Sequence, residues 1–322
     1  MRLVVVAAGL LALSFIGNGW ADEHDAETPR QWFAKMALSL RSVSYEGTFV
    51  YVSGPRMETL RLHHEVDERG EREHLFSLTG TPREVLRNGR AVTSILPDAR
   101  SVFNQSQSPS NSFPMALGDA FQRLDKLYNF HFEVRDRIAE RESRQFHVQP
   151  RDEFRYGYRV WLDGQTAIPL RVDLLDETGY PLERVMFTSF QVLETKGDKR
   201  PAMSSPPDES SVPAMPQTEA DSAQTLKHWR ITSLPDGFTL FSHVKETLPG
   251  SNQPVDHIVF SDGLVSVSAY MEHMPNRKGL SGLSRRGAFS AYGVQHNDYQ
   301  VTVVGEVPPR TVESIGRAIV PG

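Results

Sequence analysis

The sequence predicts an α+β protein built mostly from antiparallel strands and divided into two domains. Apolar and polar residues alternate in several segments with the two-residue period of half-buried strands. Hairpin signals such as Asn88-Gly89 and Asp163-Gly164 follow one another along the chain. Consecutive hairpins imply antiparallel pairing, because parallel strands need long crossovers. A Pro/Ser-rich stretch divides the 322 residues, and about 100–200 residues per domain are usual.

A secretory signal peptide is expected at residues 1–21. Met1-Arg2 supplies a positive start, Leu3 to Ile16 are apolar or small, and Gly19-Trp20-Ala21 fits a small-x-small cleavage site. The apolar run is short for a bilayer span, so an uncleaved anchor is the weaker alternative. The chain lacks cysteine, which suits an oxidising compartment and removes disulfides and cysteine-based metal sites. The expected location is the periplasm.

The first domain is predicted at 22–195 and opens with a helix. Thr28 is a good N-cap, Pro29 suits the first helical position, and Gln31 can complete a capping box. The apolar residues that follow at helical spacing are Trp32, Phe33, Met36, Leu40 and Val43.

Strands are predicted next along this domain. The alternating runs are 45–52, 59–66, 168–174 and 182–192, with a further hairpin signal at Glu177-Thr178-Gly179. In the last run, strict alternation places Val185 and Phe187 on the face opposite Met186 and Phe190. Apolar residues on both faces favour a ligand-binding sheet, or a sheet covered on both faces by the protein's own side chains.

A low-complexity Asn/Gln/Ser/Pro loop at 104–112 interrupts the strands. The apolar residues after it recur roughly at helical spacing: Met115, Leu117, Phe121, Leu124 and Tyr128. This segment is either a helical lid over one face of the sheet or an ordinary core helix.

A linker is predicted at 196–222, which is rich in proline and serine and has no aromatic residue. The second domain, 223–322, is a smaller antiparallel sheet with a helix. Its strands are predicted at 239–246, 257–260, 265–273 and 300–304, and its helix begins at Pro308-Pro309 with Val312, Ile315 and Ile319 along one side.

Composition and motifs argue against several functions. With 35 basic and 40 acidic residues the net charge is -5, which lacks the basic footprint of nucleic-acid binding. Nucleophile-elbow, zinc-protease, P-loop and dinucleotide-binding motifs are all missing. We therefore expect no enzyme activity, catalytic residue or cofactor. A hydrolase with an unrecognised site remains an alternative, which activity screening would reveal.

Polar clusters that could hold a ligand are sparse. In His63-His64-Glu65, neighbouring strand residues point to opposite faces, so no metal site is expected. Arg151-Asp152 and the pair Asp173 and Asp176 are interpreted as solvated strand ends. Arg285-Arg286, in a Gly/Ser-rich loop, is either ordinary surface or an anchor for a carboxylate or phosphate.

Several sequence blocks, taken in order over both domains, carry a resemblance to a known family. They are Tyr45-Glu46-Gly47-Thr48-Phe49-Val50-Tyr51, Gly80-Thr81-Pro82-Arg83-Glu84-Val85, Pro150-Arg151-Asp152, Arg155-Tyr156-Gly157-Tyr158, Trp161-Leu162-Asp163, Leu174-Leu175-Asp176-Glu177, Leu234-Pro235-Asp236-Gly237-Phe238, Ser261-Asp262-Gly263-Leu264 and Thr302-Val303-Val304-Gly305-Glu306-Val307-Pro308. Through them the chain resembles the RseB/MucB family, periplasmic negative regulators of the sigma-E (AlgU-type) envelope-stress response. The loop at 104–112 and the long linker depart from the family pattern.

The resemblance implies a fold and a function. The larger domain would be an unclosed antiparallel β-barrel with a helical lid, similar to the lipoprotein carriers LolA and LolB. The protein would bind the periplasmic part of an RseA/MucA-type anti-sigma factor and shield it from site-1 proteolysis. Lipopolysaccharide or another lipid would release it. A periplasmic lipid or lipoprotein carrier is the alternative, which the second domain argues against. A homo-oligomer is compatible with the sequence.

Two sets of candidate site residues follow. The lipid site would have strand walls and a lid: Phe49, Tyr51, Leu60, Leu62, Leu170, Val172 and Leu174 below, with Phe121 and Leu124 above. The partner site would lie in the second domain, at Trp229, Phe238, Arg285 and Arg286, because aromatic and arginine side chains are common interface hot spots.

Overall fold

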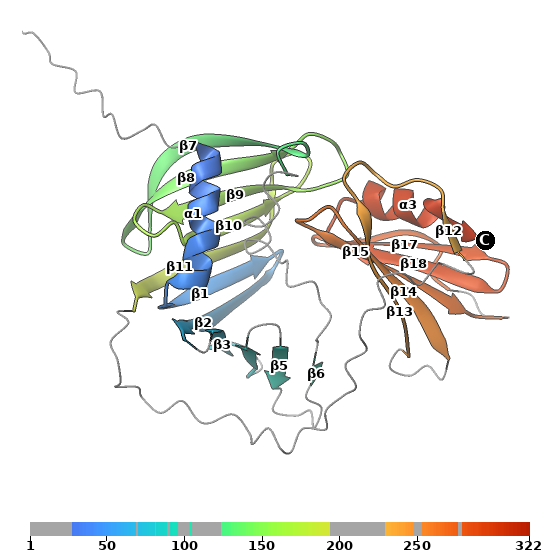
Figure 1. Cartoon of the computed structure of the whole chain (residues 1–322), viewed down its shortest axis with the longest axis horizontal. Helices are drawn as coiled ribbons and strands as arrows, with labels where there is room; N and C mark the ends of the chain where they lie inside the picture. The colour runs from blue at the N-terminus through green and yellow to red at the C-terminus, as the bar shows by residue number, and fades with distance from the viewer. Residues whose placement is uncertain are drawn as a thin grey trace, which may run out of the picture.

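The computed structural model describes residues 28–68, 70–80, 82–88, 91–95, 103–104, 124–193, 229–247, 253–275 and 279–322. Within these ranges the chain forms an 11-stranded sheet and a 6-stranded sheet, both antiparallel (Figure 1). We call 28–193 the N-terminal module and 229–322 the C-terminal module. The predicted signal peptide at 1–21, the predicted linker at 196–222, and Met115, Leu117 and Phe121 of the predicted lid lie outside the described residues.

The N-terminal module begins with helix α1 (Pro29–Ser42), which lies across one face of the large sheet (Figure 1). The predicted capping box is confirmed: the Thr28 hydroxyl accepts from the backbone N–H of Gln31, and the Gln31 side chain accepts from the backbone N–H of Thr28. The face of α1 toward the sheet buries Trp32, Phe33, Met36 and Leu40. Burial of this stripe, more than helix propensity, holds α1 in place.

The large sheet is a meander that stays open. Its strands are β1 (Tyr45–Ser53), β2 (Arg56–Asp67), β3 (Gly70–Ser77), β4 (Glu84–Asn88), β5 (Ala91–Ile95), β6 (Phe103–Asn104), β7 (Tyr128–Ile138), β8 (Arg141–Pro150), β9 (Gly157–Asp163), β10 (Pro169–Leu175) and β11 (Pro181–Val192). The spatial order is β6-β5-β4-β3-β2-β1-β11-β10-β9-β8-β7. In the described part of the chain the end strands β6 and β7 do not pair with each other, so the barrel is unclosed.

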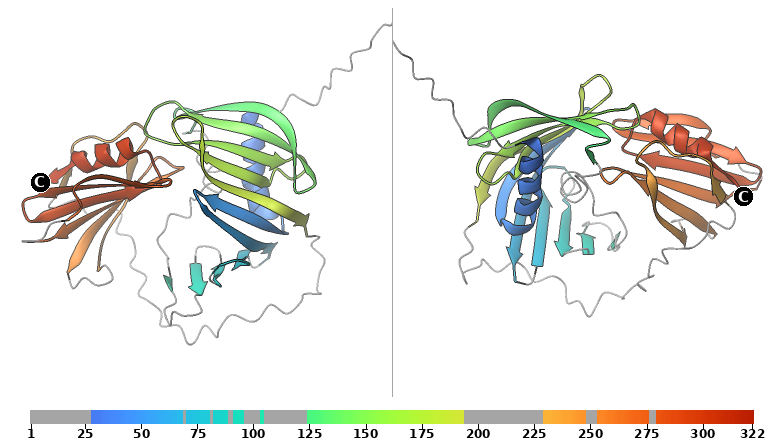
Figure 2. Two further views of the ribbon diagram at one scale, coloured as in Figure 1. Left: turned by 180° about the vertical axis from the view of Figure 1, so that it is seen from behind. Right: turned by 45° about the horizontal axis from the view of Figure 1, so that its top comes forward.

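The C-terminal module is a smaller sheet with one helix. It contains β12 (Trp229–Ile231), β13 (Thr239–Thr247), β14 (Pro254–Ser261), β15 (Ser266–His273), β16 (Gly282–Arg286), β17 (Phe289–His296), β18 (Tyr299–Gly305), α3 (Pro309–Ala318) and β19 (Ile319–Pro321). The sheet order is β13-β14-β15-β18-β17-β16, and β12 pairs with β19. Helix α3 buries Val312 and Ile315 in the same core as Tyr292 and Val303 of the sheet (Figure 2).

The predicted α+β class and the antiparallel hairpins are confirmed. Asn88 pairs with Ala91 across one predicted turn, and β9 pairs with β10 across the other. Strands β3, β7, β8, β16 and β17 were not predicted. The predicted lid helix is wrong at Tyr128, which begins strand β7. In the described ranges, no helix is long and apolar enough to cross a membrane.

Strand β11 also departs from strict alternation. Its register against β1 shifts by one residue, so Phe49 faces Phe187 while Gly47 faces Phe190. A β-bulge of this kind brings residues of odd and even number to one face. The Phe187 and Phe190 rings consequently meet edge to face at 5.4 Å, and the prediction that they lie on opposite faces is wrong.

Asp173 is not the solvated strand end that its sequence context suggested. It is fully buried between Arg171 and Arg184, with N–O distances of 2.6–3.0 Å. Burial alone would raise its pKa, but hydrogen bonds from Arg184 and Arg171 outweigh burial and hold the pKa below the usual value. These two arginines and the buried Asp173 join β10 to β11 within the large sheet.

Candidate functional site

The predicted lipid wall lies on one face of the large sheet, the face that α1 covers. Directly opposed residues of an antiparallel pair share a face. The register therefore links Phe146, Val160, Val172, Val185 and Tyr51 into one row across β8, β9, β10, β11 and β1. Phe33 of α1 packs on Phe146 at the β8 end of this row, with ring centroids 5.3 Å apart.

Burial varies along the wall from residue to residue. Leu60, Leu170 and Leu174 are buried, and Phe49, Leu62 and Val172 are partly buried against the core. Tyr51 is also partly buried, and burial raises its pKa to about 12. Leu124, the described member of the lid in the predicted lipid site, is fully buried.

Aromatic rings line the seam between β1 and β11. Phe49 meets Phe187 at 5.6 Å, Phe187 meets Phe190 at 5.4 Å, and Phe190 meets Tyr45 at 5.5 Å. Sequence alternation missed this row, because the bulge in β11 is needed to align it. A surface hollow lies away from the seam, between β7 and β8, lined by Phe132, Glu133, Val134, Arg135, Arg144 and Gln145.

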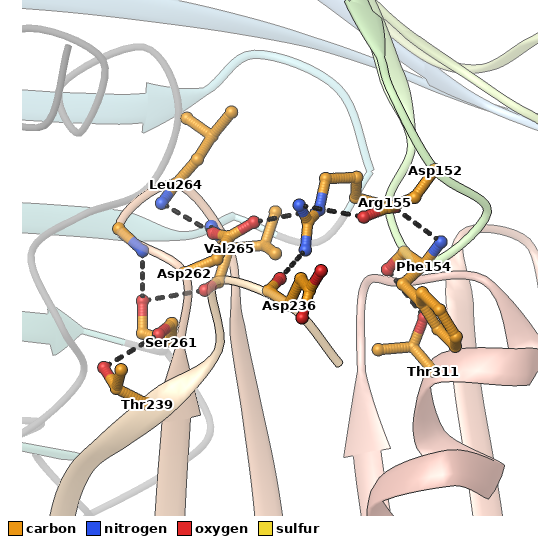
Figure 3. Close-up of polar contacts among 11 residues, drawn as sticks. Asp152, Phe154, Arg155, Asp236, Thr239, Ser261, Asp262, Leu264, Val265 and Thr311 are labelled. Atoms are coloured by element: carbon orange, nitrogen blue, oxygen red, sulfur yellow. Dashed lines mark hydrogen bonds and ion pairs between the residues drawn. The ribbon is translucent and has the colours of Figure 1, made fainter. Parts of the chain in front are cut away.

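The two modules meet at a second site, the domain junction, drawn in Figure 3. Its centre is Arg155, whose side chain is completely buried although it belongs to the turn between β8 and β9. The guanidinium donates to the backbone oxygen of Asp236 at 2.6 Å, and its Nε lies 3.3 Å from Oδ2 of Asp262. Asp152, in the same turn, lies 3.3 Å away on the other side.

Asp262 has two roles at the junction. Its Oδ1 accepts from the backbone N–H groups of Leu264 and Val265, both at 2.9 Å, which shapes the turn after β14. Its Oδ2 faces Arg155 as an ion pair without hydrogen-bond geometry. Burial raises the pKa of Asp262, against the opposing effects of those backbone hydrogen bonds and of Arg155.

Further contacts cross the junction around this ion pair. The Thr311 hydroxyl donates to the backbone oxygen of Phe154 at 2.6 Å (Figure 3), and Arg310 pairs with Glu153 at the surface. Phe238 lies under the Arg155 guanidinium, 5.3 Å from ring centre to charge. The junction is therefore closely packed, polar at its centre and fully assembled from described residues.

The predicted partner residues do not form one patch. Trp229 and Phe238 are buried, so in this conformation Trp229 supports the β12–β19 pair and Phe238 supports the junction. Arg285 and Arg286 lie in strand β16 and not in a loop, which corrects that part of the prediction. As neighbours in a strand they point to opposite faces.

These two arginines consequently have different surroundings. Arg285 lies over the ring of Tyr156 at the junction, 5.8 Å away. Arg286 is exposed and pairs across the strands with Phe289, which is 53% exposed. Both arginines are exposed, but Arg286 lies away from the junction and pairs with an exposed aromatic ring, so it presents the more open charged surface.

Sequence reasoning missed the Arg155–Asp262 pair, although both residues lie in blocks that carried the family resemblance. The blocks 155–158, 234–238 and 261–264 meet at the junction. Arg155 and Asp236 are 81 positions apart in the sequence, so no spacing rule brings them together. Their common location gives them a physical role in joining the modules.

Comparisons with known proteins show which family this is. The MucB/RseB N-terminal domain family model matches residues 28–215, and the MucB/RseB C-terminal domain model matches residues 223–320. The chain belongs to the MucB/RseB family. It is similar to the sigma-E factor regulatory protein RseB of Salmonella typhimurium, with 30% identity over 99% of this chain and 98% of that protein. It is also similar to the sigma factor AlgU regulatory protein MucB of Pseudomonas aeruginosa, with 30% identity over 90% of each chain.

Solved structures of the family match the fold across both modules. The complex structure of Pseudomonas aeruginosa MucA/MucB matches with a TM-score of 0.70 and 29% identity, over 91% of this chain and 98% of that chain. MucB in complex with MucA(peri) matches with a TM-score of 0.67 and 30% identity, over 91% and 99%. The names of these MucB/RseB relatives describe regulatory proteins and not enzymes.

Proposed function

We propose that this chain is a periplasmic regulator that binds the periplasmic part of a membrane anti-sigma factor. The observation that carries the proposal is the match, over 91% of the chain, to MucB solved in complex with MucA. Bound in this way, the chain shields its partner from site-1 proteolysis. Lipopolysaccharide or another lipid then releases the partner by favouring the partner-free state, which requires a different lipid affinity in the two states.

Two separate surfaces support this proposal, one for lipid on the N-terminal module and one for the partner on the C-terminal module. The apolar seam at β1 and β11 offers a site for acyl chains, each buried CH₂ contributing about 0.8 kcal/mol. The C-terminal module offers Arg286 and Phe289 on an open face. The buried junction holds these surfaces in a set orientation, so occupation of one can affect the other.

The direct test uses the chain from residue 22 and the periplasmic segment of the anti-sigma factor from the same organism. Calorimetry should show saturable binding, and the bound segment should resist cleavage by its site-1 protease. Added lipopolysaccharide should restore cleavage. Absence of binding, with both proteins folded, would refute the proposed function.

Arg286→Ala is expected to weaken partner binding about fivefold at low ionic strength, equivalent to ~1 kcal/mol, as for a moderate interface residue. The loss should shrink as salt screens the charge. Arg317→Ala is the charge-matched control, because Arg317 is exposed on α3, which packs on the opposite face of the small sheet. Equal loss in both variants would show that net charge matters and not the Arg286 surface.

Leu62→Asp is expected to weaken lipid binding about tenfold, which corresponds to losing roughly two buried CH₂ contacts. Leu62 is only partly buried on the wall, so a carboxylate there stays partly in water and repels acyl chains with less cost to folding than at a fully buried position. Met57→Asp is the matched control on the same strand, because Met57 is 68% exposed on the other face. The two variants can be compared with a fluorescent lipopolysaccharide.

Unchanged affinity in a folded Leu62→Asp protein would contradict the lipid wall. Transfer of lipid between vesicles by the chain alone, with no partner bound, would instead favour a periplasmic carrier.

A further inference from the structure

Three potential metal ligands meet where β2 pairs with β3. His64 lies opposite Glu73, and the next pair on the same face is Val66 with Glu71. One imidazole nitrogen and one oxygen from each carboxylate all lie within 4.8 Å of one another. Two strands that are already hydrogen-bonded therefore hold the three groups in place.

His64 points into this group, and its imidazole has an ion-pair contact with Glu73 but makes no hydrogen bond. Its side chain has no exposed surface, and neither ring nitrogen has a hydrogen-bond partner. Tyr45 stacks on the ring at 4.7 Å, which fixes its plane. Oε1 of Glu71 is also buried without a hydrogen-bond partner. A buried polar group without a hydrogen bond loses its hydration and gains nothing in return, so this arrangement is unfavourable unless something binds these groups.

The charges around the group also favour a cation. Glu73 turns its Oε1 toward His64, 3.4 Å from Nδ1, and its Oε2 toward Arg87 at 3.5 Å. Arg87 thus supports the orientation of the Glu73 carboxylate from behind, as outer-shell partners orient the ligands of metal sites.

We propose that His64, Glu71 and Glu73 bind a divalent transition-metal ion, with Zn²⁺ the best fit. Imidazole nitrogen and carboxylate oxygen bind Zn²⁺ at about 2.0–2.2 Å, so ligand atoms in a tetrahedral site lie ~3.4 Å apart. The 3.4 Å between His64 Nδ1 and Glu73 Oε1 matches this spacing. Small rotations of the Glu71 carboxylate complete a three-ligand face, and water supplies the fourth ligand.

The ion would join β2 to β3 on the same face as the lipid wall. His64 follows Leu60 and Leu62 at two-residue intervals, so all three side chains share that face. His63 takes no part: it points to the other face and lies 3.4 Å from Glu46. The sequence-based expectation that His63 and His64 diverge therefore holds, and the remaining ligands come from the neighbouring strand.

The test compares Glu71→Gln with Glu46→Gln by titrating Zn²⁺ into metal-free protein. Glutamine keeps the shape of glutamate, and Glu46 with His63 is a similar Glu–His pair on the opposite face, between β1 and β2. We expect one tight site in wild type and in Glu46→Gln, and at least tenfold weaker binding in Glu71→Gln. Zn²⁺ should also raise the Tm of wild type and Glu46→Gln, with little change in Glu71→Gln.

A thermal scan without metal shows whether each variant is folded. Equal Zn²⁺ affinity in all three folded proteins would overturn the site, because binding would then come from other surface histidines. Absence of binding to the wild type would overturn it as well.

Discussion

Asp262→Asn is expected to lower the free energy of unfolding by about 3 kcal/mol, the lower end of the range for breaking a buried ion pair. Both side chains of the Arg155–Asp262 pair have zero exposed surface. Removing the negative charge leaves a buried guanidinium, which keeps only Asp152 and the backbone oxygen of Asp236 as partners. Those two contacts are the reason that we place the effect at the lower end.

Asparagine is chosen because it removes the negative charge of the ion pair but can keep the hydrogen bonds of the turn. Its amide oxygen can still accept from the backbone N–H groups of Leu264 and Val265. Denaturant unfolding gives the stability change, and small-angle scattering shows whether the modules separate. Partner protection should decline together with the module orientation, since the proposed function uses both surfaces.

The matched control is Arg310→Ala, which breaks the other ion pair across the junction. Arg310 and Glu153 are 61% and 54% exposed, and pairs this open contribute about 0–1 kcal/mol. A similar loss in both variants would contradict the central role of Arg155 and Asp262. A double variant, Arg155→Met with Asp262→Asn, should recover part of the stability, because an apolar replacement leaves no unpaired charge.

Gly47→Ala is expected to destabilise the chain by about 2–3 kcal/mol, the upper part of the range for overpacking. A Cβ at position 47 would collide with the backbone oxygen of Ser189 and lie 2.7 Å from the Phe187 ring. A backbone atom in a paired strand cannot rotate away, so β1 and β11 must separate or the bulge must move. Either change also disturbs the aromatic seam, and lipid binding should weaken with it.

Gly54→Ala is the control for this substitution. Gly54 lies in the β1–β2 turn with φ +57°, and a Cβ there meets no atom within 4 Å. Only backbone strain remains, which is about 1–2 kcal/mol for a left-handed residue. Thermal unfolding of the two variants separates packing from strain. A Gly47→Ala protein as stable as wild type would mean that the seam is loosely packed.

Much of the local structure follows from the sequence alone. The helix after Thr28 forms where its capping box and apolar spacing predict it. Hairpins form at Asn88 and Asp163, because turn chemistry and two-residue alternation act between neighbouring residues. The wall residues, from Phe49 to Leu174, share one face for the same reason.

Other features arise from contacts between distant parts of the chain. The bulge that aligns Phe187 with Phe190 depends on the pairing of β11 with β1, far away in sequence. The burial of Trp229 and Phe238, and the opposite directions of Arg285 and Arg286, depend on which strands and modules pack around them.

The sequence by itself thus determined the fold class, the main hairpins, the capped helix and the family to which the chain belongs. Tertiary structure alone decided that Arg155 meets Asp262, and that His64 meets Glu71 and Glu73 across two strands. The physical reason is how far apart in the sequence the interacting residues lie. Helix caps, turns and alternation are set by residues a few positions apart, whereas buried charges acquire their partners only when separate strands and modules pack together.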